Sequence, residues 1–269
     1  MIVTTPIQLC AAICTHNSMR TVPRVIESLK DLADRVIVID SGSTDGTIEH
    51  CTESGCEVIR QDWQGMLVQR RRCLEAAAGA RWILLLDSDE SLEPSLRAKV
   101  RIMLAEDDAS IDAYEVRRKV HFEGAWMHHT FQPEFRLRLV RGGRGRVIGS
   151  GPQQGGIHDQ IVVPGQVGRL DGVLRHTSWR DQDDFWERSV RYARDAGRTG
   201  ERGGRVIDVL LRPPMAFVKQ YVLRSGWRDG RRGFLLAIML SVGNAMKQAT
   251  LLRRRWNAQF GESMDDTPQ

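Results

Sequence analysis

The chain has 269 residues, of which 41% are hydrophobic and 27% are charged. It is long and apolar enough to bury a full core, which excludes an intrinsically disordered chain. The net charge of +5 is unevenly spread, because residues 212–256 hold ten lysines and arginines against one acid, Asp229. Such an excess indicates an anionic partner.

An apolar run, residues 233–246, lies inside this basic stretch and is shorter than the roughly 20 residues of a membrane-spanning helix. A short apolar run beside basic residues favours a helix lying on an anionic membrane surface, and the alternative is a core helix with a solvated face. No nucleic acid is expected as a partner, since no aromatic stacking pattern or reading motif accompanies the charge.

The N-terminus shows no basic segment followed by a long apolar stretch, so we expect no signal peptide. The five cysteines show no CxxC spacing. They predict buried free thiols in a reducing cytosol.

The first hundred residues alternate between two kinds of segment. Short apolar runs predict buried strands at 7–15, 35–40, 56–60 and 81–87. Between them, helical spacing and closing glycines predict helices at 20–32, 43–55 and 65–79. This alternation predicts an α/β fold with right-handed crossovers and a mostly parallel sheet covered on both faces.

The pattern changes after residue 96. Residues 112–124 and 134–148 alternate apolar and polar side chains, as half-buried antiparallel strands do. Residues 183–197 have the spacing of a helix. The basic stretch then leads to 261–269, a segment with the composition of a flexible tail.

The polar residues at the strand ends are the candidates for a site, because ligands of parallel sheets bind beyond the carboxyl ends of the strands. GxGxxG, GxxxxGK[ST], HExxH and GxSxG are absent from the sequence. The strand ends instead hold carboxylates, with Asp40 after one strand and Asp87 and Asp89 after another. A D-x-D pair at a buried strand end suits Mg²⁺ or Mn²⁺. The alternative is that Asp89 or Ser91 caps a helix near Pro94.

Four features in this order, T-x-N, VIVIDSGSTDGT, QRR and D-x-D, resemble the nucleotide-sugar-binding half of glycosyltransferase family 2, which has the GT-A fold. Later segments, including PEFRLRLVRGGRGRV and LRHTSWR, are similar to the bacterial subgroup that adds glucose to the inner core of lipopolysaccharide. The resemblance implies a GT-A domain at 1–200, with a Rossmann-like nucleotide-sugar half at about 1–105 and an acceptor half at about 106–200. A basic, amphipathic helical extension at 201–260 and the tail at 261–269 complete the expected organisation.

The resemblance also implies roles for individual residues. The expected nucleotide-sugar ligands are Thr15, Asn17, Asp40, Gln69, Arg70 and Asp87. The expected metal ligands are Asp87, Asp89 and His176. Where the family usually has Lys, Glu and Asn, this chain has His16, Ser18 and Arg71. For the arginines the alternative is a solvated helix face, and for His176 it is a structural histidine.

An inverting transfer needs a general base that deprotonates the acceptor hydroxyl. The subgroup carries an acid in its P-D-x-x-x-R-L stretch, and here that acid is Glu134. Asp159 is the competing candidate. Both positions depart from the subgroup, which has Asp at the first and more often Glu at the second.

The implied activity is a metal-dependent, inverting transfer of a hexose, glucose from UDP-glucose, to a lipid-linked saccharide such as the lipopolysaccharide inner core. The expected location is the inner, cytoplasmic face of the cytoplasmic membrane, with the enzyme bound peripherally. The alternatives are a transferase for another envelope polysaccharide or glycolipid, and a catalytically degenerate membrane-surface scaffold. A sugar-phosphate nucleotidyltransferase is disfavoured because ICTHNSMR lacks the glycines of its phosphate loop.

Overall fold

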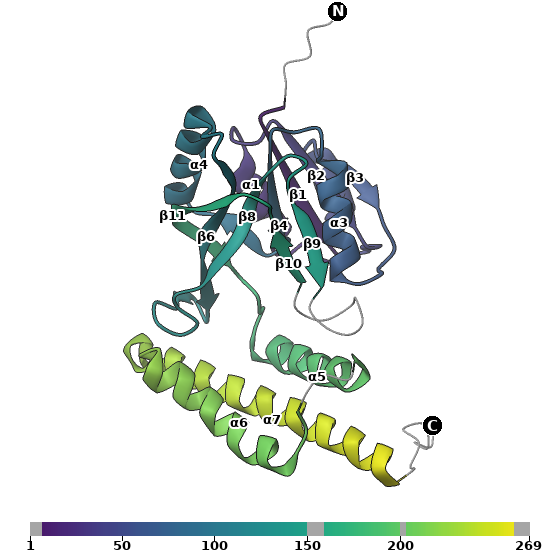
Figure 1. Ribbon diagram of the computed structural model, residues 1–269, viewed down its shortest axis with the longest axis vertical. Coiled ribbons are helices and arrows are strands. Elements are labelled where there is room, and N and C mark those ends of the chain that lie inside the picture. Colours follow the sequence, from purple (N-terminus) through teal and green to yellow (C-terminus); the bar gives the residue numbers. More distant parts are fainter. Residues whose placement is uncertain (1–6, 150–158, 200–202, 261–269) are drawn as a thin grey trace, which may run out of the picture. The chain divides into compact units, whose positions relative to one another are not determined.

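The computed structural model describes residues 7–149, 159–199 and 203–260 (Figure 1). The chain forms two compact units. The first comprises Met1–Lys119 and Pro133–Thr177, and the second comprises Val120–Gln132 and Ser178–Gln269. The second unit is therefore built from two segments that are separated in the sequence. The boundaries predicted near residues 105 and 200 separate parts by expected function rather than by compactness, and they stay predictions.

The first unit begins with the predicted alternation of strands and helices. The elements are β1 (Leu9–Thr15), α1 (Val22–Leu29), β2 (Arg35–Asp40), α2 (Thr47–Glu53), β3 (Glu57–Arg60), α3 (Met66–Ala76) and β4 (Trp82–Asp87). These strands are parallel and lie in the order β3-β2-β1-β4, so each helix is a crossover between parallel strands. The predicted strands and helices of this half are confirmed.

The sheet then changes from parallel to antiparallel. The further elements are β5 (Glu90–Leu92), α4 (Pro94–Glu106), β6 (Ile111–Phe122), β7 (Ala125–Trp126), β8 (Phe135–Arg141), β9 (Arg146–Gly149), β10 (Asp159–Val162) and β11 (Gln166–His176). Beyond β4 the strand order is β8-β6-β11-β5, and β8 runs antiparallel to both β4 and β6. The prediction of antiparallel strands after residue 96 is confirmed.

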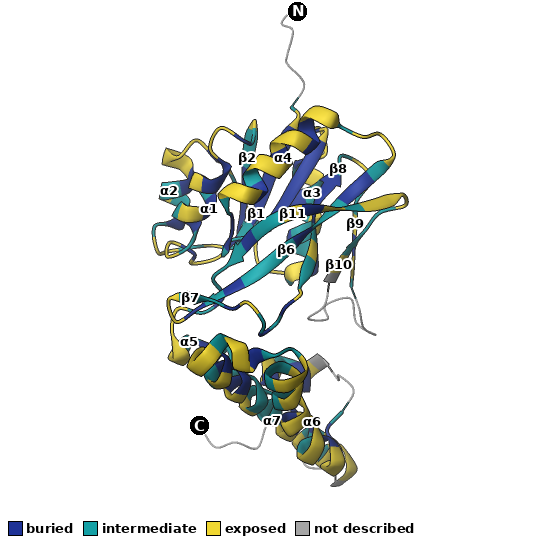
Figure 2. Ribbon diagram, turned by 90° about the vertical axis from the view of Figure 1, so that its left-hand side faces the viewer, coloured by how far each residue is buried: buried dark blue, intermediate teal, exposed yellow. Residues whose placement is uncertain are grey.

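The side chains of β1 divide the core into two layers, because successive residues of a strand point to opposite faces. Leu9, Ala11 and Ile13 pack with the buried side of α1 and with α4 residues such as Leu96. Cys10 and Ala12 pack on the other face against α3 residues such as Cys73. Helices therefore cover both faces of the parallel strands, and every residue of β1 except Cys14 is buried (Figure 2).

All five cysteines are free, and four of them are buried. Burial raises the pKa of the Cys10 thiol to about 11 and that of Cys51 to about 12. The prediction of buried free thiols is therefore confirmed, with Cys14 as the partly exposed exception.

The second unit is mainly helical. Its helices are α5 (Gln182–Thr199), α6 (Val206–Val218), the π-helical turn η1 (Lys219–Leu223), the 3₁₀ turn η2 (Gly226–Asp229) and α7 (Gly230–Phe260). The long helix α7 packs against both α5 and α6. The predicted helix at 183–197 and the predicted helical extension are both present, and the tail 261–269 lies outside the described residues.

The segment 120–132 is tied into this helical unit by an apolar cluster and by one carboxylate. Val120, Phe122 and Met127 pack with Phe185 of α5 and Leu236 of α7. The carboxylate of Asp229 accepts hydrogen bonds from three successive backbone N–H groups, those of His128, His129 and Thr130, at 2.7–3.0 Å. Burial opposes ionisation of Asp229, but these backbone donors outweigh it and lower its pKa.

Candidate active site

The carboxyl ends of β1, β2 and β4 bring most of the predicted site residues to one edge of the sheet. In the parallel registers Thr15 lies beside Asp40, and Cys14 lies beside Asp87. This is the edge at which open α/β sheets bind ligands. The site belongs entirely to the first unit.

The turn after β2 is organised by Asp40, which is fully buried. One carboxylate oxygen accepts from the backbone N–H groups of Gly42 and Ser43 at 2.9 and 2.8 Å. The other accepts from the hydroxyls of Thr15 and Ser43 at 2.7 and 2.5 Å. Burial alone would raise the pKa of Asp40, but these four hydrogen bonds lower it. The carboxylate is therefore ionised and surrounded by neutral donors.

Asn17 and Ser18 join the loop after β1 to its neighbours. Asn17 has a positive φ of 48°, its backbone N–H donates to the Ser43 hydroxyl at 2.8 Å, and its side-chain oxygen accepts from Thr44 N–H at 2.9 Å. Ser18 donates through its hydroxyl to Ser88 at 2.8 Å. These loops are thus held in one arrangement at the strand ends.

In the turn after β4, ion pairs with arginines hold Asp87 in place. Arg70 of α3 donates through Nη2 to both oxygens of Asp87, at 2.8 and 3.0 Å. Arg138 of β8 donates to one of the same oxygens at 2.8 Å. Burial opposes ionisation of Asp87, but the charges of Arg138 and Arg70 outweigh it and hold its pKa well below the usual range. Asp87 is therefore ionised at neutral pH.

Glu90 lies behind Asp87 and has no solvent exposure. Arg138 holds it with two hydrogen bonds of 2.7 Å, and Arg118 of β6 adds one of 3.1 Å. Burial works against the charge of Glu90, but Arg138 and then Arg118 compensate and lower its pKa. An unpaired charge at this depth would be strongly destabilising, so the two arginines stabilise the folded state by compensating Glu90.

The candidate base Glu134 ends the same chain of ion pairs. Arg118 binds it with two hydrogen bonds of 2.7 and 3.1 Å, and Arg136 adds another of 2.7 Å. Burial would raise the pKa of Glu134, but the hydrogen bonds and charge of Arg118, with the charge of Arg136, lower it. Glu134 is thus ionised at neutral pH, as a general base must be.

Asp89 and His176 come together at the same edge. The strand β11 pairs antiparallel with β5, which sets His176 opposite Glu90 and brings its Nε2 to 3.6 Å from an Asp89 oxygen. Both side chains keep partial exposure, 15% for His176 and 20% for Asp89. A carboxylate oxygen and an imidazole nitrogen at this separation fit a shared divalent cation. Within residues 7–149, 159–199 and 203–260, no cluster of three or more His, Cys, Asp or Glu side chains is arranged for a metal.

Gln69 is fully buried on α3. Its side-chain nitrogen donates to the backbone carbonyls of Gln61 and Asp62, both at 3.1 Å, and thereby fixes the loop after β3. Its side-chain oxygen has no hydrogen-bond partner among the described residues. The amide is therefore placed to support that loop, and its predicted role at the nucleotide stays a prediction.

The competing base Asp159 opens β10, where its backbone lies opposite Gly149. The side chain of Asp159 lies outside what the structure describes. Its role therefore also stays a prediction.

The helix-cap alternative for the D-x-D turn is wrong. The helix α4 begins at Pro94, its N-cap residue is Glu93, and no side chain caps it. Residues 90–92, including Ser91, form a strand instead. Asp89 is thus left beside His176 and away from the start of α4.

Three residues of the ion-pair chain were missed by the sequence interpretation, namely Glu90, Arg118 and Arg138. Arg138 is the arginine of the P-D-x-x-x-R-L pattern that pointed to Glu134, so a signal for it was present. Glu90 directly follows the D-x-D pair. Arg118 had no distinguishing signal within its alternating strand.

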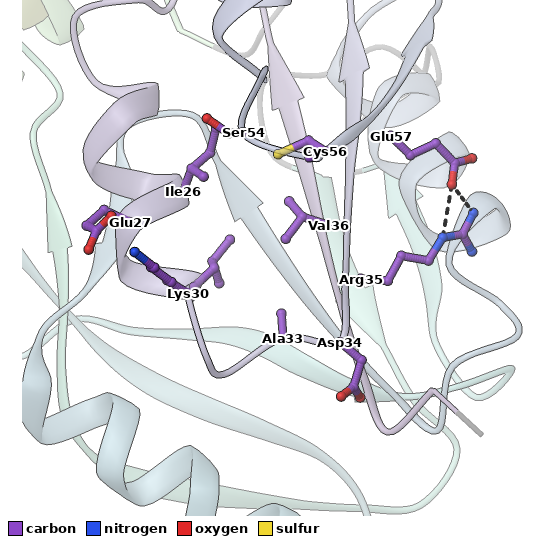
Figure 3. A pocket seen from close by; sticks show the side chains of 12 residues that line it. Ile26, Glu27, Lys30, Ala33, Asp34, Arg35, Val36, Ser54, Cys56 and Glu57 are labelled. Atoms are coloured by element: carbon purple, nitrogen blue, oxygen red, sulfur yellow. Dashed lines mark hydrogen bonds and ion pairs between the residues drawn. The ribbon is translucent and has the colours of Figure 1, made fainter. Parts of the chain in front are cut away.

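A cavity of about 550 Å³ lies at the opposite edge of the sheet (Figure 3). It is lined by the end of α1 and by the amino ends of β2 and β3, where Arg35 and Glu57 form an ion pair. It therefore lies away from the strand ends that hold the candidate site.

Comparisons with known proteins identify the family of the chain. A family model described as "Glycosyl transferase family 2" matches residues 10–157. The chain is 28% identical over 256 residues to the lipopolysaccharide core biosynthesis glycosyltransferase LpsC of Rhizobium meliloti, covering 91% of this chain and 92% of that one.

Two solved structures are also similar. TarS of S. aureus (residues 1–349) matches with a TM-score of 0.46 and 14% identity, over 96% of this chain and 93% of that chain. Glucosyl-3-phosphoglycerate synthase of Mycobacterium tuberculosis, solved in complex with Mn²⁺ and UDP-glucose, matches with a TM-score of 0.35 and 26% identity. That match covers 43% of this chain and 44% of the other.

Proposed function

The chain belongs to glycosyltransferase family 2 and has the GT-A fold, and from that premise we propose that it transfers glucose from UDP-glucose, with inversion, to a lipid-linked saccharide such as the lipopolysaccharide inner core. The observation that carries this proposal is the gathering of Asp40, Asp87, Asp89 and His176 at one edge of the sheet. The name of the relative LpsC supports a lipopolysaccharide-core acceptor.

We assign Asp40 to the uracil ring of the donor. An ionised carboxylate accepts a hydrogen bond from a ring N–H, but the four acceptor positions of Asp40 are already used. The backbone donors are fixed, whereas a hydroxyl can rotate. The hydroxyls of Thr15 and Ser43 are thus the ones that would yield to the base, which supports the proposal that Thr15 belongs to the nucleotide site.

Arg70 and Asp87 form the diphosphate side of the proposed site. The Arg70 guanidinium lies beside Asp87 with its side chain 12% exposed, where it can compensate phosphate charge. Arg138 holds Asp87 from behind, so Asp87 keeps its position if Arg70 turns towards the donor.

The residues present fit a divalent cation, Mg²⁺ or Mn²⁺, held by Asp89 and His176 with Asp87 nearby. The imidazole nitrogen favours Mn²⁺ of the two, and phosphate oxygens and water would supply the remaining ligands. Bound there, such a cation would neutralise charge on the leaving nucleoside diphosphate.

Glu134 is proposed as the base that takes the proton of the acceptor hydroxyl. The acceptor oxygen then bonds to the sugar carbon as the bond from that carbon to the diphosphate breaks. Two guanidiniums hold Glu134 in its ionised form, so its pairing with Arg118 must loosen when it takes the proton. Asp159 remains the alternative base.

The proposed place of action is the inner face of the cytoplasmic membrane, at an anionic surface, with the protein bound peripherally. A lipid-linked acceptor requires an enzyme that works at the membrane. The basic stretch at 212–256 supports this placement.

The test is hydrolysis of nucleotide sugars by the purified chain, with and without Mn²⁺, together with thermal stabilisation by each donor. We expect UDP-glucose to be preferred, and Asp89→Ala to lower the rate by about 10²-fold or more. Asp171→Ala, an exposed aspartate on the same strand as His176, is the matched control and should retain full activity. A preference for ADP- or GDP-linked sugars would contradict the assignment of Asp40 to uracil.

A further inference from the structure

The helix α6 exposes a row of large apolar side chains that no described residue of the second unit covers. They recur every three or four residues, which places them along one side of the helix. Their exposure is high, reaching 63% for Leu210 and 64% for Met215. We call this set the α6 face: Val206, Ile207, Leu210, Leu211, Met215 and Val218.

Other residues of α6 make its contacts with α7. The Pro213 carbonyl accepts a hydrogen bond from the Ser241 hydroxyl at 2.8 Å, and the rings of Phe217 and Phe234 lie 6.0 Å apart. The charged residues of α6, Asp208 and Arg212, bind each other at 2.9 Å. The α6 face is therefore a set of apolar side chains that the contacts with α7 leave exposed.

The apolar exposure continues into the two turns that follow. Leu223 of η1 is 75% exposed and Trp227 of η2 is 58% exposed. Soluble monomers seldom expose contiguous apolar patches of this kind unless a partner or a membrane covers them.

The charges around the α6 face indicate that a membrane, rather than a partner protein, covers it. Residues 205–232 contain seven arginines and lysines and two acids, Asp208 and Asp229. Both acids are engaged internally, Asp208 by Arg205 and Arg212, and Asp229 by the backbone of 128–130. An apolar helix face within a segment that carries this excess of positive charge is complementary to an anionic bilayer surface.

The apolar run predicted to lie on the membrane, 233–246, is partly packed inside the unit. Leu236, Ala237 and Met239 are fully or almost fully buried, whereas a short row of Phe234, Ile238 and Val242 is exposed. One helix, Gly226–Gln259, is long and apolar enough to cross a membrane by length and composition, and 28% of its apolar window is buried. The α6 face is thus a more continuous apolar surface than the run that the sequence singled out.

We propose that α6 and η1 lie flat in an anionic membrane interface, with the α6 face at the boundary of the acyl chains and the surrounding arginines at the level of the phosphates. This inference rests on the proposed function only in that a lipid-linked acceptor gives the enzyme a reason to be there.

The experiment is vesicle flotation of the full chain without substrate. Wild type floats with vesicles of phosphatidylglycerol and phosphatidylethanolamine, and much less with phosphatidylcholine alone. Replacing Leu210 and Met215 together by Ser lowers the partition coefficient about 100-fold, since each side chain contributes roughly a tenfold effect. Ile102→Ser, on the exposed side of α4 in the first unit, is the matched control and leaves flotation unchanged.

Four results would overturn the inference. The first two are that wild type does not float and that the variant and the control lose flotation equally. The third is that bound protein resists extraction by alkaline carbonate, which indicates a spanning helix, and the fourth is that the α6 substitutions dissociate a dimer without changing flotation. Hydrolysis of the donor in solution separates this inference from the proposed function. Flotation without hydrolysis contradicts the function alone, and hydrolysis without flotation contradicts the membrane face alone.

Discussion

The turns after β2 and β4 each hold an aspartate at the end of a buried parallel strand, but the two carboxylates are stabilised by opposite kinds of partner. Asp40 accepts four hydrogen bonds from neutral groups, and those of Gly42 and Ser43 come from its own turn. Asp87 is held by Arg70 and Arg138, which lie 17 and 51 residues away.

This difference separates a locally built site from one built by the tertiary fold. The turn after β2 keeps a negative charge that is stabilised by neutral donors alone, two of them hydroxyls that can rotate away for a ligand. The turn after β4 is electrically balanced by arginines from α3 and β8, so its charge depends on the correct pairing of distant strands. Substitutions in the two turns should therefore differ in size and in their dependence on pH.

The largest effect is expected for Arg138→Met. It leaves the buried carboxylates of Glu90 and Asp87 without their common partner, which costs about 3–5 kcal/mol of unfolding free energy. Urea denaturation followed by circular dichroism measures this loss. The matched control is Arg136→Met, two residues earlier on β8 and 50% exposed, which should cost at most about 1 kcal/mol. Equal losses in the two variants would show that the buried network is not what holds the turn after β4.

A smaller effect is expected for Asp40→Asn. The amide presents N–H groups to donors that now bind a carboxylate, so about 1–3 kcal/mol of unfolding free energy should be lost. The same denaturation experiment measures it, and Asp171→Asn at an exposed position should stay within about 0.5 kcal/mol of wild type. If Asp40→Asn lost as much unfolding free energy as Arg138→Met, neutral and charged partners would stabilise the two turns equally, contrary to this prediction.

The smallest effect is a difference in acid sensitivity. The pKa values of Asp87, Glu90 and Glu134 are lowered in the folded state. Their contribution to stability is therefore present above the ordinary carboxyl pKa of about 4 and is lost as the pH falls through their lowered values. Tm measured from about pH 7 to about pH 3 should fall more steeply in wild type than in Arg138→Met, whose carboxylates have lost a partner. Parallel Tm curves for the two proteins would argue against the network as the source of the acid sensitivity.

The first half of the fold and the strand-end acids were predictable because their signals are local. A buried apolar run followed by polar residues marks a strand and its carboxyl end without reference to the rest of the chain, and this placed Asp40, Asp87 and Asp89 correctly at the edge of the sheet.

The arginines could not be predicted in the same way. Arg136 and Arg138 alternate with apolar residues in the same strand and look alike in the sequence, yet one side chain is 50% exposed and the other 4%. What separates them is where each lies along the pairing of β8 with β4 and β6, which is non-local. The strand at 90–92 was missed for the same reason, since it exists only through its pairing with β11.

The discontinuous second unit makes the chain difficult to cut. Val120–Gln132 leaves the first unit, supplies three amides to Asp229 and part of an apolar cluster to the helices, and returns at Pro133. A truncation at residue 177 would remove the helices that Phe122 and Met127 pack against and would expose these apolar side chains. The helices therefore form one packing unit with Val120–Gln132, and removing them should lower the solubility of the remaining chain.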